Sequence, residues 1–403
     1  MKECWCGNKN LNNYTKQYAR CNECHTLISR HPFQNDIYEV DNDEDGLYGK
    51  NYWDIDMIRA AGKNTLSEVL DMYLTERVVY WMKYIFRYVT PGGSVAEVGC
   101  GLGQLAYALK CAGFEQIAYE LSPGICNYIR NELKIQVRCG SFEEKKDAYD
   151  AVLAFDLFEH LLEPLDFLKQ CSNSLKEHGV LCMQTPCYDS NLDYKEMMTQ
   201  CPRFEEQLKE EQHVYLYSKT AIERILQSAG FRHIVFVPAF FGDDYDMFLF
   251  ASKQSIQMNK EQETDDYLNR VSNGRLIKAM IRLFDEKQEY LQKVRTEQEN
   301  SVERLKQNER LTELLKESEA DRAARLGQVQ HLTELLTESE ADRAARLEQV
   351  QHLTELLKES EADRAARLEQ IHQLSSMLEE SEADRAARFE QIQHLTELLK
   401  KKR

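Results

Sequence analysis

A 21-residue repeat near the carboxyl end of the chain restricts the fold most strongly. Four copies of a sequence close to LTELLKESEADRAARLEQVQH begin at Leu311, Leu332, Leu353 and Leu374, and a partial fifth copy begins at Leu395. The period is three heptads, so apolar residues return to the same helix face in every copy. Residues 306–403 are therefore predicted to form a long α-helical coiled coil with a left-handed supercoil.

The seam of this coiled coil is only partly apolar. In the best heptad register Val329, Leu332 and Leu336 fill successive a, d and a positions, and Ser339 and Arg343 fill the next two. Polar seam residues lower stability and leave the strand number open, so we expect a homo-oligomer that is a trimer or a dimer. A single helix stabilised by Glu and Arg pairs four residues apart is the alternative.

The repeats differ in composition from the rest of the chain. All twelve cysteines, all three tryptophans and all seven prolines lie before residue 256. Residues 1–255 are therefore predicted to hold the globular core, and residues 256–305 a helical linker. The formal net charge of −17 argues against a nucleic-acid partner, because phosphate binding needs clustered Lys and Arg.

The sequence has no apolar run of signal-peptide or membrane-spanning length. We therefore expect a cytoplasmic protein, at most peripheral at the inner membrane through its terminal KKKR. In such a reducing compartment cysteine spacing indicates metal binding rather than disulfides.

Four cysteines near the amino terminus have such a spacing. Cys4 and Cys6 form a C-x-C pair, and Cys21 and Cys24 form a C-x2-C pair. Four thiolates suit a tetrahedral zinc ion with no open position, so residues 1–40 are predicted to be a structural zinc knuckle. Four unrelated thiols are the alternative.

A strand, a glycine-rich turn and a helix are predicted in SVAEVGCGLGQLAYALK, residues 94–110. The spacing of Gly99, Gly101 and Gly103 matches neither the dinucleotide fingerprint nor a P-loop. What remains is a nucleoside whose neighbouring groups are not phosphates. Glu97 supports this interpretation, because a carboxylate repels pyrophosphate and attracts a cationic amino group.

Three further apolar runs continue the alternation of strands and helices. The second run ends at Glu120, which is placed to accept hydrogen bonds from ribose hydroxyls. The third leads to Ser141 and Phe142, which are placed to border an adenine, and the fourth ends at Phe155. The expected fold class is α/β.

Together, EVGCGLG, the acid of YELSP, YDAVLAFDLFEHLLEPLDFLK and GVLCMQTP resemble class I S-adenosylmethionine-dependent methyltransferases over residues 91–252. The resemblance implies a seven-stranded Rossmann-like sheet in a domain at residues 91–255, with S-adenosylmethionine as cofactor. By position it implies these cofactor-binding residues: Glu97, Gly99, Gly101, Gly103, Glu120, Leu121, Ser141, Phe142 and Phe155.

Residues 41–90 are expected to form a helical lid segment. The knuckle followed by LYGKNYW at 47–53 resembles small methyltransferases that act on sugars. The resemblance implies that Tyr48, Tyr52 and Trp53 lie near the cofactor mouth. A helix-capping aromatic cluster is the alternative.

An alcohol acceptor must lose its proton as it is methylated, so the site needs a base or a metal ion. His160, in FEHL after the fourth strand, is the first candidate base; alternatively, Glu159 and His160 brace the cofactor loop. His213 follows a polar insertion at 187–212 and is the second candidate. Asp156 is the third, with loop capping as its alternative role.

The combination of a catalytic head and a coiled coil resembles bacterial enzymes that cap O-polysaccharide (O-antigen) chains by methylation. The resemblance implies a glycan or sugar acceptor, an assembly glycosyltransferase as partner, and a coil that oligomerises and spaces the heads. Two alternatives remain open. One is O- or N-methylation of a small molecule, or C-methylation of a nucleotide sugar, and the other is a non-catalytic scaffold with a degenerate cofactor-binding head.

Overall fold

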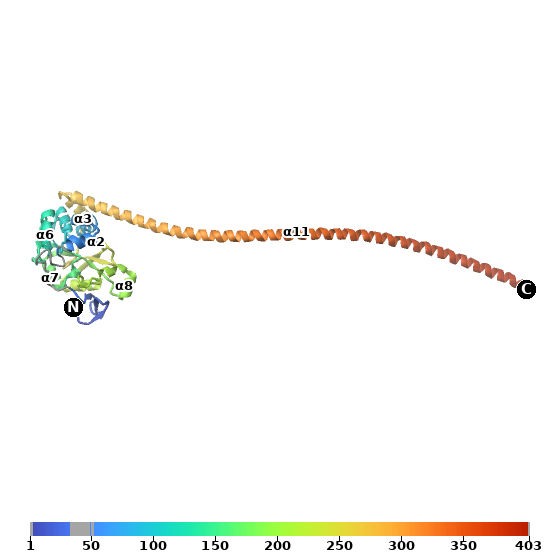
Figure 1. The fold of residues 1–403 in the computed structure, drawn as a ribbon, viewed down its shortest axis with the longest axis horizontal. Coiled ribbons are helices and arrows are strands. Elements are labelled where there is room, and N and C mark those ends of the chain that lie inside the picture. The colour runs from blue at the N-terminus through green and yellow to red at the C-terminus, as the bar shows by residue number, and fades with distance from the viewer. Residues whose placement is uncertain (1–2, 33–48, 50–51, 402–403) are drawn as a thin grey trace. The chain divides into compact units, whose positions relative to one another are not determined.

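The computed structural model describes residues 3–32, 49 and 52–401 of the chain, which divide into two units (Figure 1). Unit 1 is Met1–Arg295 and unit 2 is Thr296–Arg403. Tyr48, one of the aromatic residues expected near the cofactor mouth, lies outside the described residues.

The strands are β1 (Leu11–Asn13), β2 (Tyr18–Cys21), β3 (Leu27–Ser29), β4 (Ser94–Val98), β5 (Glu115–Glu120), β6 (Val137–Cys139), β7 (Tyr149–Phe155), β8 (Leu175–Pro186), β9 (Tyr215–Leu216), β10 (His233–Val237) and β11 (Asp246–Ser252). The α-helices are α2 (Ile58–Ala60), α3 (Leu66–Thr75), α4 (Arg77–Tyr88), α5 (Gln104–Cys111), α6 (Pro123–Tyr128), α7 (Pro164–Ser174), α8 (Tyr194–Gln200), α9 (Lys219–Ser228), α10 (Glu261–Leu268) and α11 (Gly274–Lys400). Short π- or 3₁₀-helical turns are η1 (Tyr52–Met57), η2 (Ile129–Leu133), η3 (Phe158–His160) and η4 (Pro202–Gln207).

The central sheet of unit 1 is seven-stranded and mixed, in the order β10-β11-β8-β7-β4-β5-β6. Strands β4 to β8 are parallel, whereas β11 runs antiparallel to both β8 and β10. The predicted α/β fold is confirmed, as are the strand before the glycine turn, which is β4, and the apolar run that ends at Phe155, which is β7. The strand order reverses between β4 and β7, and the carboxyl ends of strands at such a point form a crevice.

Helices cover both faces of this sheet. Leu168 of α7 and Ile222 of α9 share a core with Val152 of β7. Ile85 of α4 lies in a second core with Leu153, the next residue of the same strand. Successive strand residues point to opposite faces, so the apolar run of β7 supplies both cores. Helix α4, which falls in the predicted lid segment, is thus a layer of the core.

The amino-terminal strands form a second sheet, in the order β1-β2-β3-β9. Leu27 of β3 pairs with Leu216 of β9, a strand that follows the polar insertion. The Tyr18 hydroxyl donates to the backbone carbonyl of His213 at 2.9 Å, and the backbone N–H of Ser29 donates to the Val214 carbonyl at 2.9 Å. The cysteine-bearing segment is therefore built onto the chain that carries His213, close to α8 (Figure 1).

The first part of the predicted linker packs against unit 1. The Tyr267 hydroxyl of α10 donates to the Gly113 carbonyl at 2.8 Å, and Leu268 is buried. Ile277 and Phe284 of α11 are buried as well. They are one heptad, or about two helical turns, apart on one helix face, which explains why α11 starts against the globular core before it continues into unit 2.

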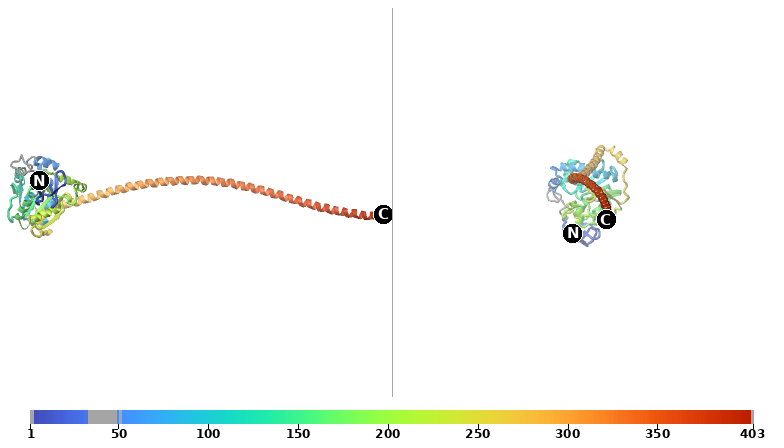
Figure 2. Two further views of the ribbon diagram at one scale, coloured as in Figure 1. Left: turned by 90° about the horizontal axis from the view of Figure 1, so that it is seen from below. Right: turned by 90° about the vertical axis from the view of Figure 1, so that its right-hand side faces the viewer.

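Unit 2 consists of the remaining α11 residues, drawn as a gently curved helix in Figure 2. Its leucines are exposed in the single chain; Leu336, for example, is 61% exposed. Asp–Arg pairs four residues apart recur once in each repeat, at 2.8–3.0 Å. None of the described helices has an eighteen-residue stretch apolar enough to span a bilayer.

Candidate functional site

A cavity of about 740 Å³ lies at the carboxyl ends of β4, β5 and β7. Its volume is in the range of pockets that hold a cofactor or a drug-sized ligand. Its wall contains these predicted site residues: Glu97, Gly99, Gly101, Glu120, Leu121, Ser141, Phe142, Phe155, Asp156, His160 and His213. Tyr52 and Trp53 also line the cavity.

The glycine turn after β4 has two roles. Gly101 has φ +54°, and a Cβ there would lie 3.1 Å from the Trp53 ring, so a side chain is excluded by backbone and by space. Gly103 has φ +77°, and its Cβ would lie 3.0 Å from Ile129 Cγ1. Gly103 is absent from the cavity wall, so its position favours close packing at the start of α5 rather than ligand contact.

Glu120, the last residue of β5, holds the glycine turn. One carboxylate oxygen accepts the Gly101 N–H at 3.0 Å, and the other accepts the Leu121 and Ser122 N–H groups at 2.9 and 3.1 Å. Burial raises the pKa of Glu120 against the effect of these donors. A carboxylate offers about four acceptor positions, and these N–H groups occupy three of them. About one position therefore remains for a ligand hydroxyl, and a second hydroxyl would displace the Gly101 N–H.

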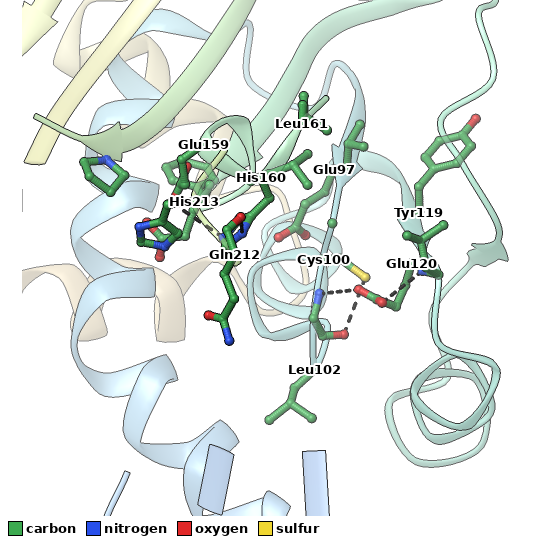
Figure 3. Close-up of a pocket in the computed structure, with 18 of the residues that line it drawn as sticks. Glu97, Cys100, Leu102, Tyr119, Glu120, Glu159, His160, Leu161, Gln212 and His213 are labelled. Atoms are coloured by element: carbon green, nitrogen blue, oxygen red, sulfur yellow. Dashed lines mark hydrogen bonds and ion pairs between the residues drawn. The ribbon is translucent and has the colours of Figure 1, made fainter. Parts of the chain in front are cut away.

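Glu97 lies between the Glu120 end of the cavity and the histidine end (Figure 3). It is 6% exposed, and its Oε2 has no hydrogen-bond partner among the described residues. Burial, and secondarily the Glu120 carboxylate, raises the pKa of Glu97 to about 8. A buried carboxyl group with one unpaired oxygen is suited to a cationic ligand group, which would ionise it.

Glu159, His160 and His213 meet at the other end (Figure 3). His160 Nδ1 lies 3.0 Å from the Gln212 carbonyl, and His213 Nδ1 lies 2.8 Å from the Gln207 carbonyl. The two rings are 4.9 Å apart. Burial lowers the pKa of His160 to about 4, and burial followed by the adjacent His160 lowers that of His213 to about 3. Both imidazoles are therefore neutral at pH 7.

Asp156 lies in a polar network after β7. Its carboxylate accepts from Arg77 at 2.9 Å and from the Gln184 side chain at 3.1 Å. Arg77 stacks over the Tyr73 ring at 4.0 Å, and the Trp81 indole donates to Gln184 Oε1 at 3.0 Å. Asp156 is thus held by partners, as expected for a carboxylate that shapes a loop.

Sequence patterns did not identify several residues of the cavity wall. Arg77 and Trp81 come from α4, and the buried Asp246 comes from the start of β11. Burial raises the pKa of Asp246 to about 8. Asp246 could have been identified from the sequence, because it is an acid at the start of an otherwise apolar strand. Arg77 could not, because its place in the cavity wall depends on how α4 packs.

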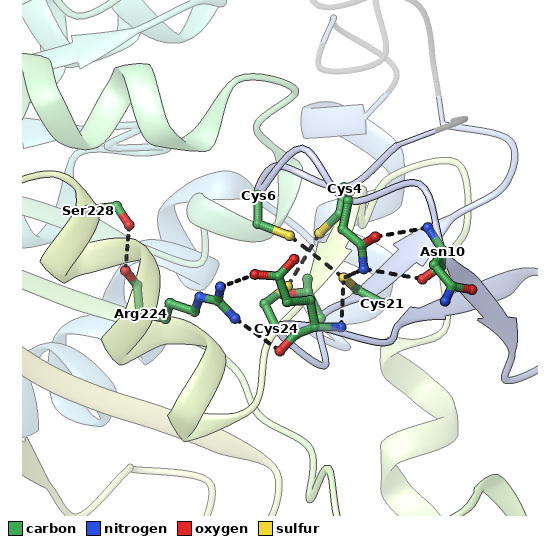
Figure 4. Close-up of polar contacts among 10 residues, drawn as sticks. Cys4, Cys6, Asn10, Cys21, Cys24, Arg224 and Ser228 are labelled. Atoms are coloured by element: carbon green, nitrogen blue, oxygen red, sulfur yellow. Dashed lines mark hydrogen bonds and ion pairs between the residues drawn. The ribbon is translucent and has the colours of Figure 1, made fainter.

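The four amino-terminal cysteine sulfurs converge on one another (Figure 4), and none of these cysteines is in the wall of the cavity. Cys4 Sγ lies 3.4 Å from Cys24 Sγ, and Cys6 Sγ lies 3.7 Å from Cys21 Sγ. Four ligands about 2.3 Å from a tetrahedral ion lie about 3.8 Å from one another, so this arrangement fits zinc. Burial raises the pKa of Cys6 to about 11, so a cation is needed to favour its thiolate form.

Residues 73–235 match the family model described as "Methyltransferase domain". This stretch contains β4 to β9 and most of the cavity wall. The chain therefore carries a methyltransferase domain, as the sequence motifs predicted.

Curated relatives and a solved structure are also similar to part of the chain. A ubiquinone biosynthesis O-methyltransferase of Xanthomonas campestris pv. campestris is 26% identical over 160 residues, which are 38% of this chain and 62% of the relative. The enzyme of the same name from Bradyrhizobium diazoefficiens is 30% identical over 101 residues, covering 23% of this chain and 40% of the relative. A SAM-dependent methyltransferase structure from Thermotoga maritima has 18% identity and a TM-score of 0.36, covering 47% of this chain and 96% of that one. The matched region thus spans less than two thirds of the curated relatives.

Proposed function

We propose that this chain, through its methyltransferase domain, transfers the methyl group of S-adenosylmethionine to a hydroxyl group. The proposal rests mainly on one observation: two buried acids, Glu97 and Glu120, line the cavity on either side of the glycine turn. Glu120 is placed for the ribose, and Glu97 for the cationic amino group of the cofactor.

The acceptor is placed at the Glu159, His160 and His213 end of the cavity. As the acceptor oxygen bonds to the methyl carbon, the carbon–sulfur bond breaks and its electron pair neutralises the sulfonium. The hydroxyl proton must leave, and both imidazoles are neutral at pH 7, so each has a nitrogen lone pair that can accept a proton or bind a cation. An oxygen acceptor also agrees with the names of the curated relatives.

We further propose a sugar hydroxyl, on a surface polysaccharide, as the acceptor. Amide and acidic side chains with an adjacent tyrosine line the acceptor end: Gln207, Gln212, Tyr245 and Asp246. Such groups can hydrogen-bond several hydroxyls of one ring. The relatives' names favour a phenolic acceptor of ubiquinone synthesis as the second candidate.

A panel assay with labelled cofactor and the full chain tests the proposed acceptor. It compares neutral polysaccharides, nucleotide sugars and ubiquinone precursors. Label in the polysaccharides supports the proposal, label confined to ubiquinone precursors supports the second candidate, and no label in any acceptor contradicts hydroxyl methylation.

The Glu120→Ala variant is expected to bind S-adenosylmethionine with about 1–3 kcal/mol less favourable free energy, because charged hydrogen bonds to the ribose are lost. The affinity should fall roughly 5- to 150-fold in calorimetric titrations. Glu115→Ala, an exposed acid at the other end of β5, is the matched control. Equal affinity in both variants would remove Glu120 from the ribose site.

Cofactor binding is expected to release a proton from Glu97. A folded-state pKa of about 8 leaves roughly nine tenths of this group protonated at pH 7. The incoming ammonium group favours the carboxylate, so release approaches one proton at pH 7 and vanishes near pH 9, and affinity rises with pH up to about 8. Calorimetry in buffers of different ionisation enthalpy measures the release. Proton release that persists in Glu97→Gln assigns the proton to another group.

We also propose that the repeats of α11 join two or three copies of the chain. The exposed leucines return at whole-heptad intervals, which suits identical helices in register. A chain ending at Arg295 is expected to be monomeric, whereas the full chain is a dimer or trimer in light scattering. A monomeric full chain would mean that the repeats form a single helix.

A further inference from the structure

Three potential metal ligands gather at the acceptor end of the cavity. One ligand atom each from Glu159, His160 and His213 lies within 4.8 Å of the others. Glu159 is 2% and His213 5% exposed. His160 Nε2 lies 3.8 Å from Glu159 Oε1. They come from η3 and from the chain before β9, so only the fold brings them together.

Each of these side chains is oriented by an outer partner. Thr185 donates a hydrogen bond to Glu159 Oε2 at 2.8 Å, which turns Oε1 toward His160. A carbonyl can only accept, so the Nδ1 atoms that face Gln212 and Gln207 carry the protons. In both neutral imidazoles Nε2 therefore holds the lone pair. Metal-binding histidines usually donate their other N–H to a carbonyl or carboxylate in this way.

The spacing requires little adjustment to hold one ion. Ligand atoms about 2.1 Å from a common cation lie roughly 3 to 4.2 Å apart. The three ligand atoms lie within 4.8 Å of one another, which is slightly farther apart than a bound ion requires. Small side-chain rotations can close this difference. Two imidazole nitrogens and one carboxylate oxygen on one side of an ion leave positions open on the other, and they suit divalent first-row transition metals.

The charges around the cluster also favour a cation. Asp156 and Asp246 line the same cavity as Glu159. Among the described residues of the cavity wall, Arg77 pairs with Asp156 at 2.9 Å and Lys209 is a second cation, so the carboxylates Asp156, Glu159 and Asp246 outnumber the cations. A divalent ion beside Glu159 would compensate the remaining carboxylates.

We propose that Glu159, His160 and His213 form a binding site for a divalent transition-metal cation whose open positions face the cavity. The site itself stands on this geometry, and its role rests on the function proposed above. An acceptor hydroxyl that binds the cation releases its proton to solvent more readily, and its oxygen then attacks the methyl carbon. His160 and His213 act through the ion, which replaces their direct action as bases.

Manganese binding to the full chain tests the site, using protein that holds a single zinc ion per chain, bound at the cysteine cluster. Mn²⁺ prefers nitrogen and oxygen ligands to thiolates, so it reports on this site. The electron paramagnetic resonance signal of free Mn²⁺ is expected to disappear at one ion per chain. His213→Ala and Glu159→Gln should weaken binding by more than tenfold, and His233→Ala, at an exposed histidine, should not change it.

The conservative variant Thr185→Val keeps the size of the side chain but loses the bond that orients Glu159. It is expected to weaken Mn²⁺ binding roughly 10- to 100-fold. If a ligand variant misfolds and no longer binds S-adenosylmethionine, Thr185→Val is compared with wild type in its place. Absence of Mn²⁺ binding, or equal binding in wild type and variants, overturns the site. Full methyl transfer by protein that retains only the cysteine-bound zinc overturns its role. Mn²⁺ binding with the expected variant pattern, but without methylation of any acceptor, supports the site and contradicts the proposed function.

Discussion

Replacing His160 or His213 by alanine is expected to lower kcat for methyl transfer by roughly 10²- to 10⁴-fold. The two rings lie 4.9 Å apart at the acceptor end, beside Glu159. Either substitution removes a nitrogen that promotes loss of the hydroxyl proton, whether by accepting it or by holding a cation. Single-turnover assays with labelled S-adenosylmethionine measure the effect on the chemical step.

The same variants are expected to bind the cofactor within about twofold of wild type, because the predicted ribose contact is at Glu120. His233→Ala is the matched control, since this exposed histidine lies on β10 outside the cavity wall. If cofactor affinity falls as far as kcat, His160 braces the cofactor loop, as the alternative sequence interpretation has it. If kcat falls less than tenfold, the acceptor lies elsewhere.

Removing zinc from the cysteine cluster is expected to unfold the amino-terminal segment, because structural zinc supplies on the order of 10 kcal/mol of folding free energy in small domains. The acceptor end of the cavity should then lose its arrangement as well. Tyr18 and Ser29 hold the carbonyls of His213 and Val214, and β3 pairs with β9. A misplacement of about 1 Å at a reacting group can cost 10²-fold in rate, so activity should fall by at least that factor.

The measurement compares Cys24→Ser with Cys139→Ser, which changes an exposed cysteine outside the cluster. Zinc content should fall from one ion per chain only in Cys24→Ser, together with kcat, whereas cofactor affinity is retained in both. Normal zinc content in Cys24→Ser would contradict the four-thiolate site. Lost zinc with unchanged activity would show that the knuckle does not support His213.

The sequence predicted the part of the fold that depends on local pattern. Apolar runs identified β4 and β7, and Glu120 was predicted to end the second run, which is β5. The turn glycines were also visible. Gly103, however, cannot be distinguished from Gly101 by spacing, because the atoms that a Cβ would meet, here those of Ile129, depend on tertiary packing.

Long-range contacts were beyond the sequence. His160 and His213 were each considered as a base, but nothing in the order of residues indicates that their rings meet beside Glu159. The pairing of β3 with β9 joins segments separated by most of unit 1. The docking of α10 and of the start of α11 likewise depends on a surface formed by distant residues, so the predicted linker boundary missed it.

A crystal structure of the chain with S-adenosylhomocysteine tests the proposed cofactor site. We expect the nucleoside in the cavity, its ribose hydroxyls on Glu120, its amino group at Glu97 and its sulfur directed toward Glu159, His160 and His213. Binding outside this cavity, or a ribose that leaves Glu120 bonded only to Gly101, Leu121 and Ser122, would contradict it.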